Sequence, residues 1–391
     1  MNQPFAKNRT AFTLVEMLVS VAVLVLLMTF VAQMMNSTML STTLSGKHVD
    51  TDGEARLVFD RMAVDFGRMF RRNDVDYIFS KQPDPNNPNS LGATSGSSDE
   101  MFFYSEAPAY FAAPISGTNY NSSVALTGYS LYTTGTNPVI PNFSLLRLSK
   151  GLSWDATNAT GPGGMVFLTS TGAGGLPIGA SSIPGTTGSA NFGGAIGFNP
   201  SYIPGDLTDY DVLSSEVFRM EFCFQVKNLT NSQTMPGTVY SNYPIGYVAG
   251  VTRPVTPNMP TTANVGDRWY DPVANRAYIC SGYTGAATGT PSPIWTPNGM
   301  SDVTAIVVAI AILDKTSRSL VPSLAQLAGA LADPTEDTNP STGLQAQSPH
   351  LMAETWQNAI TSGTFAASAG IPQVAAAQIR VYQRYFYLNN N

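Results

Sequence analysis

Residues 12–35 read FTLVEMLVSVAVLVLLMTFVAQMM, and this stretch decides the architecture of the chain. It contains 24 residues and a single charge, Glu16. As an α-helix it would be about 36 Å long, enough to cross a hydrocarbon layer about 30 Å thick. The residues before it include Lys7 and Arg9 but no acid. Because basic flanks stay on the cytoplasmic side, the sequence predicts a single membrane span with the N-terminus inside and the rest of the chain outside.

Two simpler interpretations of this span fit less well. A secretory signal peptide has an apolar region of only about 7–15 residues, followed by an A-x-A-like cleavage site, and no such site follows cleanly here. A plain membrane anchor accounts for the length of the span but not for Glu16. A carboxylate in a membrane costs free energy unless it has a partner, so the sequence predicts a partner for Glu16.

The residues around the start of the span form a recognisable pattern. Residues 11–16 read AFTLVE and follow a short basic leader. This pattern resembles the signal of type IV prepilins and type II secretion pseudopilins. The resemblance implies that a prepilin peptidase removes the leader (residues 1–11) and methylates the new N-terminus, Phe12. The family almost always has Gly where this chain has Ala11, and we expect processing to survive because both residues are small.

The same resemblance implies a role for Glu16 in assembly. Cleavage would create a cationic amine on Phe12, and a cation buried among packed helices needs an anion. In the family this pair is assigned between neighbouring subunits of a filament. The implied partners are other pilins or pseudopilins, an assembly platform in the bacterial cytoplasmic (inner) membrane, and the lipid bilayer, with the head in the periplasm. Many major pilins have Pro where this chain has Gln33.

A second helical pattern follows the span. The chain has no proline between Pro4 and Pro83, and apolar residues recur every three or four positions from Ala55 to Phe70. This pattern predicts an amphipathic helix outside the cytoplasm over residues 36–80, packed against the head. Two i,i+4 ion pairs, Arg56–Asp60 and Arg61–Asp65, are predicted on its other faces.

Residues 56–66 of this second pattern resemble the corresponding helix of J-type minor pseudopilins and W-type minor pilins. That likeness favours a minor over a major subunit. The long loops and the C-terminal sequence are also similar to the C protein of the Verru_Chthon prepilin-type cassette. This second likeness adds no biochemical role.

Residues 81–391 predict a β-rich head, because short apolar runs alternate there with turn residues. The predicted strands are residues 101–104, 124–132, 143–148, 166–169, 217–226, 303–313 and 378–388. Short helices are predicted at residues 323–331 and 351–360, and long loops at residues 151–204. The apolar run 303–313 predicts a central strand covered on both faces. The fold class is therefore α+β, and the resemblance implies a pilin-like fold with an antiparallel sheet and long loop insertions.

An inserted aromatic hairpin region is predicted at about residues 230–300. Its four large rings are Trp269, Tyr270, Tyr278 and Trp295. As an exposed platform they would bind a glycan or polymer, and the chain would be a membrane-anchored surface binding module. The preferred interpretation is a small core of their own, because a short hairpin needs aromatic rings to bury enough apolar area.

Two further sets of residues have chemical potential. Cys223 and Cys280 lie on predicted strands, and the sequence leaves open whether they form a disulfide or two buried thiols. Three acidic residues lie close together in a predicted loop, and oxygen-rich loops of this kind hold Ca²⁺ in some proteins. These residues are Asp206, Asp209 and Asp211, which match no full calcium-loop pattern.

The composition argues against other classes of function. The chain has only two His and two Cys, which excludes a His/Cys metal cluster and most His-dependent enzyme chemistry, so no enzyme and no cofactor are predicted. A net charge of −6 argues against nucleic acid as the main partner. Three arginines near the predicted helix end, Arg68, Arg71 and Arg72, are interpreted as a solvated helix terminus rather than a phosphate site.

Overall fold

Helix α1 (Leu14–Gly67) is the longest element, and it continues through both predicted helical patterns without a break. The computed structural model describes residues 13–72, 75, 77–80, 98–106, 109–111, 120–122, 125–132, 143–151, 210–227, 239–246, 259–271, 276–284, 292–331 and 351–388. The chain divides into two compact units, Met1–Asp52 and Gly53–Asn391. The prediction of a helix reaching residue 80 is wrong, because α1 ends at Gly67 and strand β1 (Tyr77–Ser80) follows.

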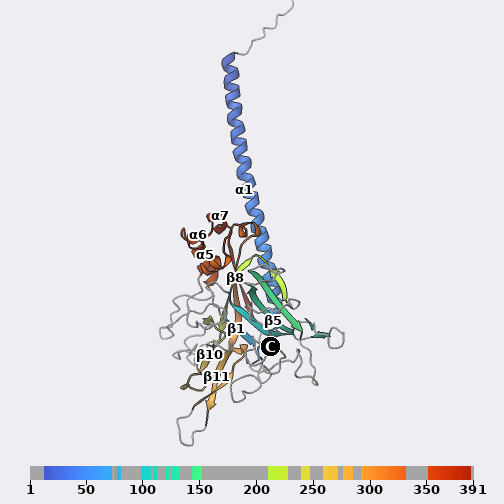
Figure 1. The fold of residues 1–391 in the computed structure, drawn as a ribbon, viewed down its shortest axis with the longest axis vertical. Helices are drawn as coiled ribbons and strands as arrows, with labels where there is room; N and C mark the ends of the chain where they lie inside the picture. The colour runs from blue at the N-terminus through green and yellow to red at the C-terminus, as the bar shows by residue number, and fades with distance from the viewer. Residues whose placement is uncertain are drawn as a thin grey trace, which may run out of the picture. The chain divides into compact units, whose positions relative to one another are not determined.

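The second unit, called the head below, contains four antiparallel sheets among its described residues (Figure 1). The five-stranded sheet has the order β1, β2 (Glu100–Ser105), β5 (Ala125–Tyr132), β6 (Ser144–Gly151) and β7 (Tyr210–Ser214). The four-stranded sheet has the order β14 (Arg380–Tyr387), β13 (Val303–Ile312), β8 (Val217–Val226) and β9 (Val239–Ser241). The three-stranded sheet consists of β10 (Arg268–Asp271), β11 (Arg276–Tyr283) and β12 (Pro293–Pro297), and a two-stranded sheet of β3 (Ala109–Phe111) and β4 (Tyr120–Ser122).

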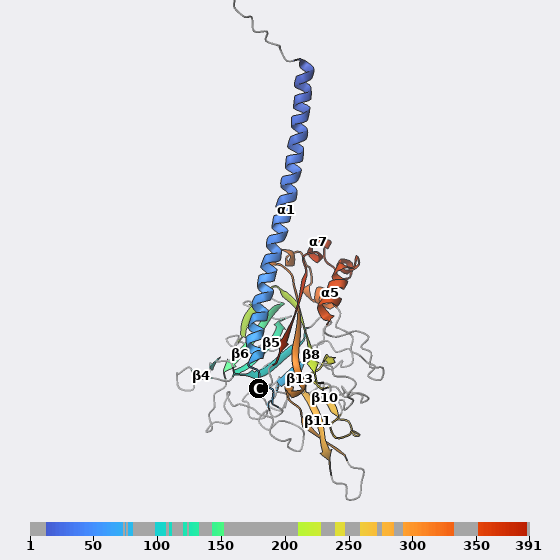
Figure 2. The same cartoon turned by 180° about the vertical axis from the view of Figure 1, so that it is seen from behind.

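Short helices lie between β13 and β14 in the sequence. They are α3 (Lys315–Arg318), α4 (Leu324–Gly329), α5 (Met352–Thr361), α6 (Phe365–Ser368) and α7 (Gln373–Ala376), and the turn η2 (Met300–Asp302) precedes β13. In both views α5 and α7 lie near one end of the head, and the strands β10 and β11 lie toward the other (Figure 1 and Figure 2).

Most predicted elements of the head are confirmed. The runs predicted as strands at residues 101–104, 124–132, 143–148, 217–226, 303–313 and 378–388 form β2, β5, β6, β8, β13 and β14. The predicted helices at residues 323–331 and 351–360 form α4 and α5. The predicted strand at residues 166–169 and nearly all of the predicted loops at residues 151–204 lie outside the described residues.

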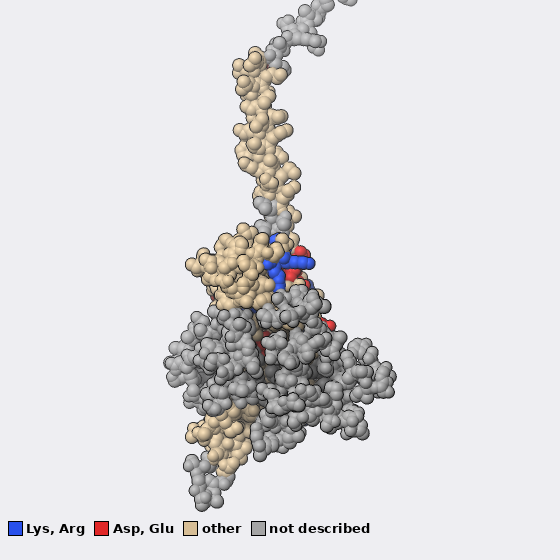
Figure 3. Space-filling model, viewed as in Figure 1, with Lys and Arg blue, Asp and Glu red and all other residues tan. Residues whose placement is uncertain are grey.

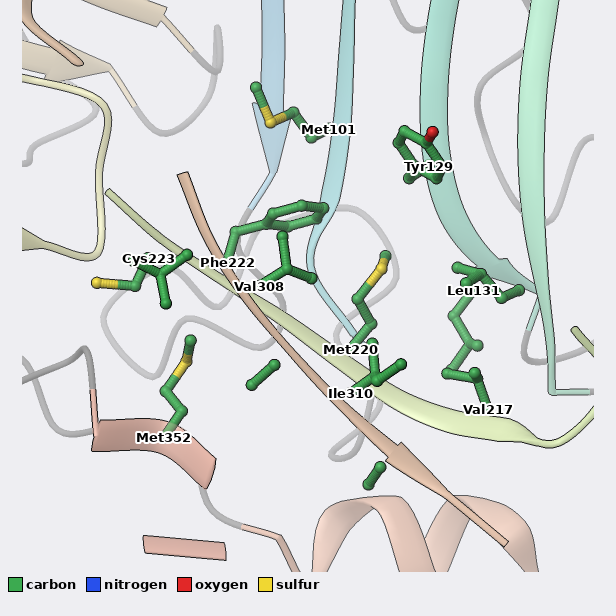
Figure 4. Packing of buried hydrophobic residues seen from close by; sticks show 14 of the residues in the cluster. Met101, Tyr129, Leu131, Val217, Met220, Phe222, Cys223, Val308, Ile310 and Met352 are labelled. Carbon is green, nitrogen blue, oxygen red and sulfur yellow. The ribbon is translucent and has the colours of Figure 1, made fainter. Parts of the chain in front are cut away.

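Strand β13 is central, as predicted. It pairs with β14 on one side and β8 on the other, and nine of its ten residues are buried. Met220 and Phe222 of β8 share one face with Val308 and Ile310 of β13, and Figure 4 shows these side chains beside residues of the five-stranded sheet. The opposite face is buried as well, since Met352 of α5 belongs to the same core.

Helix α1 supplies one wall of this core within the head. Its apolar stripe is buried, which confirms the predicted packing: Ala55, Val58, Phe59, Met62 and Phe66. The Phe66 ring lies 5.3 Å from that of Phe103 in β2 and 5.2 Å from that of Phe386 in β14, measured between ring centroids. One aromatic side chain therefore joins the helix to both large sheets.

The prediction that Asp65 lies on an outer face of the helix is wrong, because the side chain is fully buried. Arg147 of β6 donates two hydrogen bonds to its carboxylate, at 2.6 Å from Nε and 3.0 Å from Nη2. The Tyr129 hydroxyl of β5 donates a third at 2.5 Å. Arg61 remains near the carboxylate at 3.6 Å, as its spacing predicts. Burial, together with the Asp65 charge, raises the pKa of Tyr129 well above its usual value, so the hydroxyl stays protonated and donates.

We predict that Asp65→Asn destabilises the head by about 3–5 kcal/mol, because the buried Arg147 guanidinium loses its buried carboxylate partner and keeps only the exposed Asp211 carboxylate at 3.6 Å. The matched control is Asp60→Asn, which removes a half-exposed carboxylate from the same helix and its 2.7 Å contact with Arg384. Urea unfolding of the full chain in detergent measures both. Equal shifts of the two midpoints would contradict the assignment.

Glu100, at the start of β2, carries a carboxyl group that titrates in an unusual range. Burial raises its pKa to about 7, although the Ser130 hydroxyl donates a hydrogen bond to it at 2.9 Å. In an unfolded chain a Glu titrates near pH 4.3. Between these two pH values Glu100 is protonated in the folded protein but ionised in the unfolded chain. The free energy of unfolding therefore falls as the pH rises from about 4 to about 7.

We therefore expect Glu100→Gln to remove this part of the pH dependence. The stability of the variant relative to the wild-type protein should increase between about pH 5 and about pH 8, and chemical unfolding at each pH measures it. Glu106→Gln, which changes an exposed carboxylate just beyond the same strand, is the control. A constant difference between Glu100→Gln and wild type across this range would show that Glu100 titrates normally.

Candidate functional site

The N-terminal end of α1 places Glu16 in a defined local geometry. Thr13 immediately precedes the helix, and its hydroxyl accepts a hydrogen bond from the Glu16 backbone N–H at 3.3 Å. In return, one carboxylate oxygen of Glu16, Oε2, accepts from the Thr13 backbone N–H at 3.0 Å and from its hydroxyl at 3.1 Å. This reciprocal arrangement is a capping box.

The capping box explains how the chain accommodates a carboxylate in an apolar stretch. The first N–H groups of a helix have no partner within it, and they favour negative charge. Glu16 lies at this end of the helix. Among the described residues, both hydrogen bonds that Thr13 donates to its carboxylate go to Oε2. The other oxygen, Oε1, is then available for a further donor.

Residues Leu14–Met39 form a helix that is long and apolar enough to cross a membrane, and none of it is buried within the protein. The face visible in Figure 3 shows no charged side chain along this part of the helix. Three of its hydroxyl groups bond to carbonyl oxygens one turn back: Ser20 to Met17 at 2.9 Å, Thr29 to Leu26 at 2.7 Å and Thr38 to Met34 at 2.8 Å. These polar groups are therefore satisfied within the helix, as a membrane environment requires.

Comparison with known families supports this reading of the N-terminus. Residues 6–32 match the model of a family described as the prokaryotic N-terminal methylation motif. The chain carries a type IV prepilin-like signal. The match includes Ala11 and Phe12, which lie outside the described residues, and Glu16. The long apolar helix followed by a β-rich head is consistent with a pilin-like α+β fold. No curated protein and no solved structure matches the chain significantly.

The four aromatic residues Trp269, Tyr270, Tyr278 and Trp295 are buried and form no exposed platform, so the structure contradicts the alternative of a binding surface made of these rings. Trp269, Tyr278 and Trp295 form a small cluster with Cys280, in which the Trp269 and Tyr278 rings stack at 4.8 Å between centroids. Tyr270 points elsewhere and belongs to the main core. The preferred interpretation, a small core of its own, holds for three of the four rings.

The three-stranded sheet is also bound to the rest of the head. The Tyr270 hydroxyl donates to the carbonyl oxygen of Phe79 in β1 at 2.5 Å. The Arg268 guanidinium bonds to the buried carboxylate of Asp302 at 2.9 Å, and the Asn298 amide donates to the same oxygen at 2.7 Å. The hairpin region is therefore part of the head rather than a separate module.

Three of the remaining candidate residues lie in described strands of the head: Cys223, Cys280 and Asp211. Cys223 and Cys280 form no disulfide and are both buried thiols, the second of the two alternatives that the sequence left open. Asp211 lies in strand β7 rather than in a loop, with its carboxylate 3.6 Å from Arg147. Asp206 and Asp209 lie outside the described residues, so calcium binding there stays a prediction. Among the described residues no group of three His, Cys, Asp or Glu gathers to hold a metal.

The predicted solvated arginine cluster is only partly correct. Arg71 is half-buried, and its guanidinium donates to the carbonyl oxygens of Val303 at 3.2 Å and Leu388 at 3.0 Å. Arg68 and Arg72 are exposed. The sequence interpretation included Thr13 in the signal but overlooked its capping contact with Glu16, although the T-x-x-E spacing is the sequence signature of a capping box.

Proposed function

We propose that the chain is a minor pilin or pseudopilin, a structural subunit of a type IV pilus or of a type II secretion-type filament. A prepilin peptidase would cleave before Phe12 and methylate it. The match at residues 6–32 carries this proposal, together with the membrane-length helix that begins inside the match. The partners are then the peptidase, other pilins or pseudopilins, and an assembly platform in the cytoplasmic membrane.

The capping geometry gives Glu16 a role in this proposal. After cleavage the cationic amine of Phe12 stands one residue before Thr13. When helices of several subunits pack together, that amine loses water and needs an anion. Glu16 meets this need with Oε1 while Oε2 remains bonded to Thr13. The carboxylate of one subunit would then hold the amine of its neighbour and fix the axial register of the two helices.

The alternative of a surface binding module has lost its support, because the rings assigned to ligand binding are buried. A glycan stacks on exposed ring faces, and the stacked pair Trp269 and Tyr278 lies within a cluster with both rings more than nine-tenths buried. We therefore assign the head a structural role in the filament.

The first test is the mass of the N-terminal peptide after extraction from membranes of the native host. We expect a peptide that begins with N-methylated Phe12, because the small side chain of Ala11 fits where the family has Gly. Ala11→Gly should give the same peptide, and Ala11→Leu should leave the leader attached. A wild-type peptide that still begins at Met1 would contradict the proposal.

The second test separates assembly from membrane insertion. Glu16→Ala should still insert, because the change makes the span more apolar, but its amount in sheared filaments should fall by about tenfold or more, because the amine loses its anion. Ser20→Ala is the control, since its hydroxyl bonds only to its own helix among the contacts described. If Glu16→Ala enters filaments as well as Ser20→Ala does, the assigned role is wrong.

A further inference from the structure

The short helices between β13 and β14 form one group at an end of the head, called the helical cap below. It consists of α3 to α7 with the described turns between them, residues 315–331 and 351–376. Helix α3 lies beside α7, and α6 lies beside both α5 and α7. The Gln326 side chain of α4 donates to the carbonyl oxygen of Ser368 in α6 at 3.4 Å, so all five helices are connected.

The helical cap lies at the end of the head at which α1 enters. Strand β14 begins shortly after α7 and runs beside α1 in the same direction. Arg384 of β14 contacts Asp60 at 2.7 Å, and two residues further on the Phe386 ring lies 5.2 Å from that of Phe66. The start of β14, and α7 before it, therefore lie near the residues of α1 that enter the head first. Both views show α5 and α7 at this end (Figure 1 and Figure 2).

The surface of the helical cap combines very little charge with exposed apolar side chains. Residues 355–379 contain no Asp, Glu, Lys or Arg, although charged residues make up 12% of the chain. Over α5, α6 and α7 the face visible in Figure 3 shows no charged side chain. Val374 on α7 is 69% exposed, and Leu320, which follows the neighbouring helix α3, is 50% exposed. Exposed apolar side chains on an uncharged surface indicate an interaction site.

We propose that the helical cap docks on the surface of the lipid bilayer that holds the N-terminal span. The membrane-length segment ends at Met39 and the head begins at Gly53. Along an α-helix this separation is about 21 Å, and the polar headgroups of a bilayer fill about 5–7 Å of it. The chain therefore tethers the cap near lipid at a high effective concentration, so a small apolar contact is sufficient for docking.

The charge and the side chains of the helical cap favour a lipid surface over a protein partner. The described cap contains three charged residues, Lys315, Arg318 and Glu354, so its net charge is +1 while that of the whole chain is −6. Anionic lipids that repel the rest of an acidic head therefore do not repel this end. Protein interfaces are anchored by Trp, Tyr and Arg in fitted pockets, whereas the exposed side chains of residues 361–377 are mostly Ala, Ser, Thr and Gly.

The experiment compares a fluorescent label on the helical cap with a matched label near the other end of the head. Val374→Cys and Val265→Cys each replace a valine that is more than half exposed, and Val265 lies just before β10. Because Cys223 and Cys280 are buried, the label reacts at the new thiol. The full chain is reconstituted in phosphatidylcholine vesicles that contain lipids carrying a quencher. We expect quenching at residue 374 to be at least about twofold stronger than at residue 265.

A second variant tests the contact itself. With the label at residue 374, Leu320→Asp should reduce quenching by about half or more, because it places a charge in the apolar contact, while Ile294→Asp on β12 should leave quenching unchanged.

Equal quenching at residues 374 and 265 would overturn the proposal. So would a label at residue 374 that is unquenched in vesicles but shielded in membranes of the native host, because a protein would then cover the helical cap. The vesicles contain no peptidase and no other pilin, so failure of docking is distinguishable from failure of the proposed function.

Discussion

Helix α1 carries Asp65 on the face that packs against the sheets of the head. The need to neutralise this buried carboxylate constrains the structure around it. Arg147 from β6 and the Tyr129 hydroxyl from β5 reach it from two neighbouring strands. Each hydrogen bond has a defined length and direction, so a shift of either strand along the helix would break at least one of them. Breaking a buried ion pair costs far more than forming it contributes, and such shifts are therefore opposed.

The aromatic core around this ion pair extends to every large element of the head. Phe66 contacts rings from both large sheets, and Phe79 of β1 packs against Phe224 with ring centroids 4.8 Å apart. Tyr270 brings the three-stranded sheet to the same core and bonds to the backbone of Phe79. Tyr270 thus ties the three-stranded sheet to the core of the head, and the rings of Trp269, Tyr278 and Trp295 are buried in a cluster beside it.

The N-terminal part of α1 is stabilised differently, because no described part of the chain covers its apolar surface. None of the described part of the chain buries the span, and several polar groups within it have local partners: Ser20, Thr29 and Thr38 donate to carbonyls one turn back, and one oxygen of the Glu16 carboxylate accepts from Thr13. A lipid bilayer or other helices of the same kind can cover the apolar surface of such a helix.

The sequence alone determined the features that depend on local pattern. The membrane-length helix, the signal around Glu16, the central strand β13 and the apolar stripe of α1 follow from composition and periodicity, which act between near neighbours. Only the tertiary structure decided the fate of Asp65, whose i,i+4 partner predicted a surface pair while its true partner lies 82 residues away. Long-range contacts also decided the burial of Trp269, Tyr270, Tyr278 and Trp295. An aromatic ring serves equally well in a core or on a binding surface, and the difference depends on what the rest of the chain places over it.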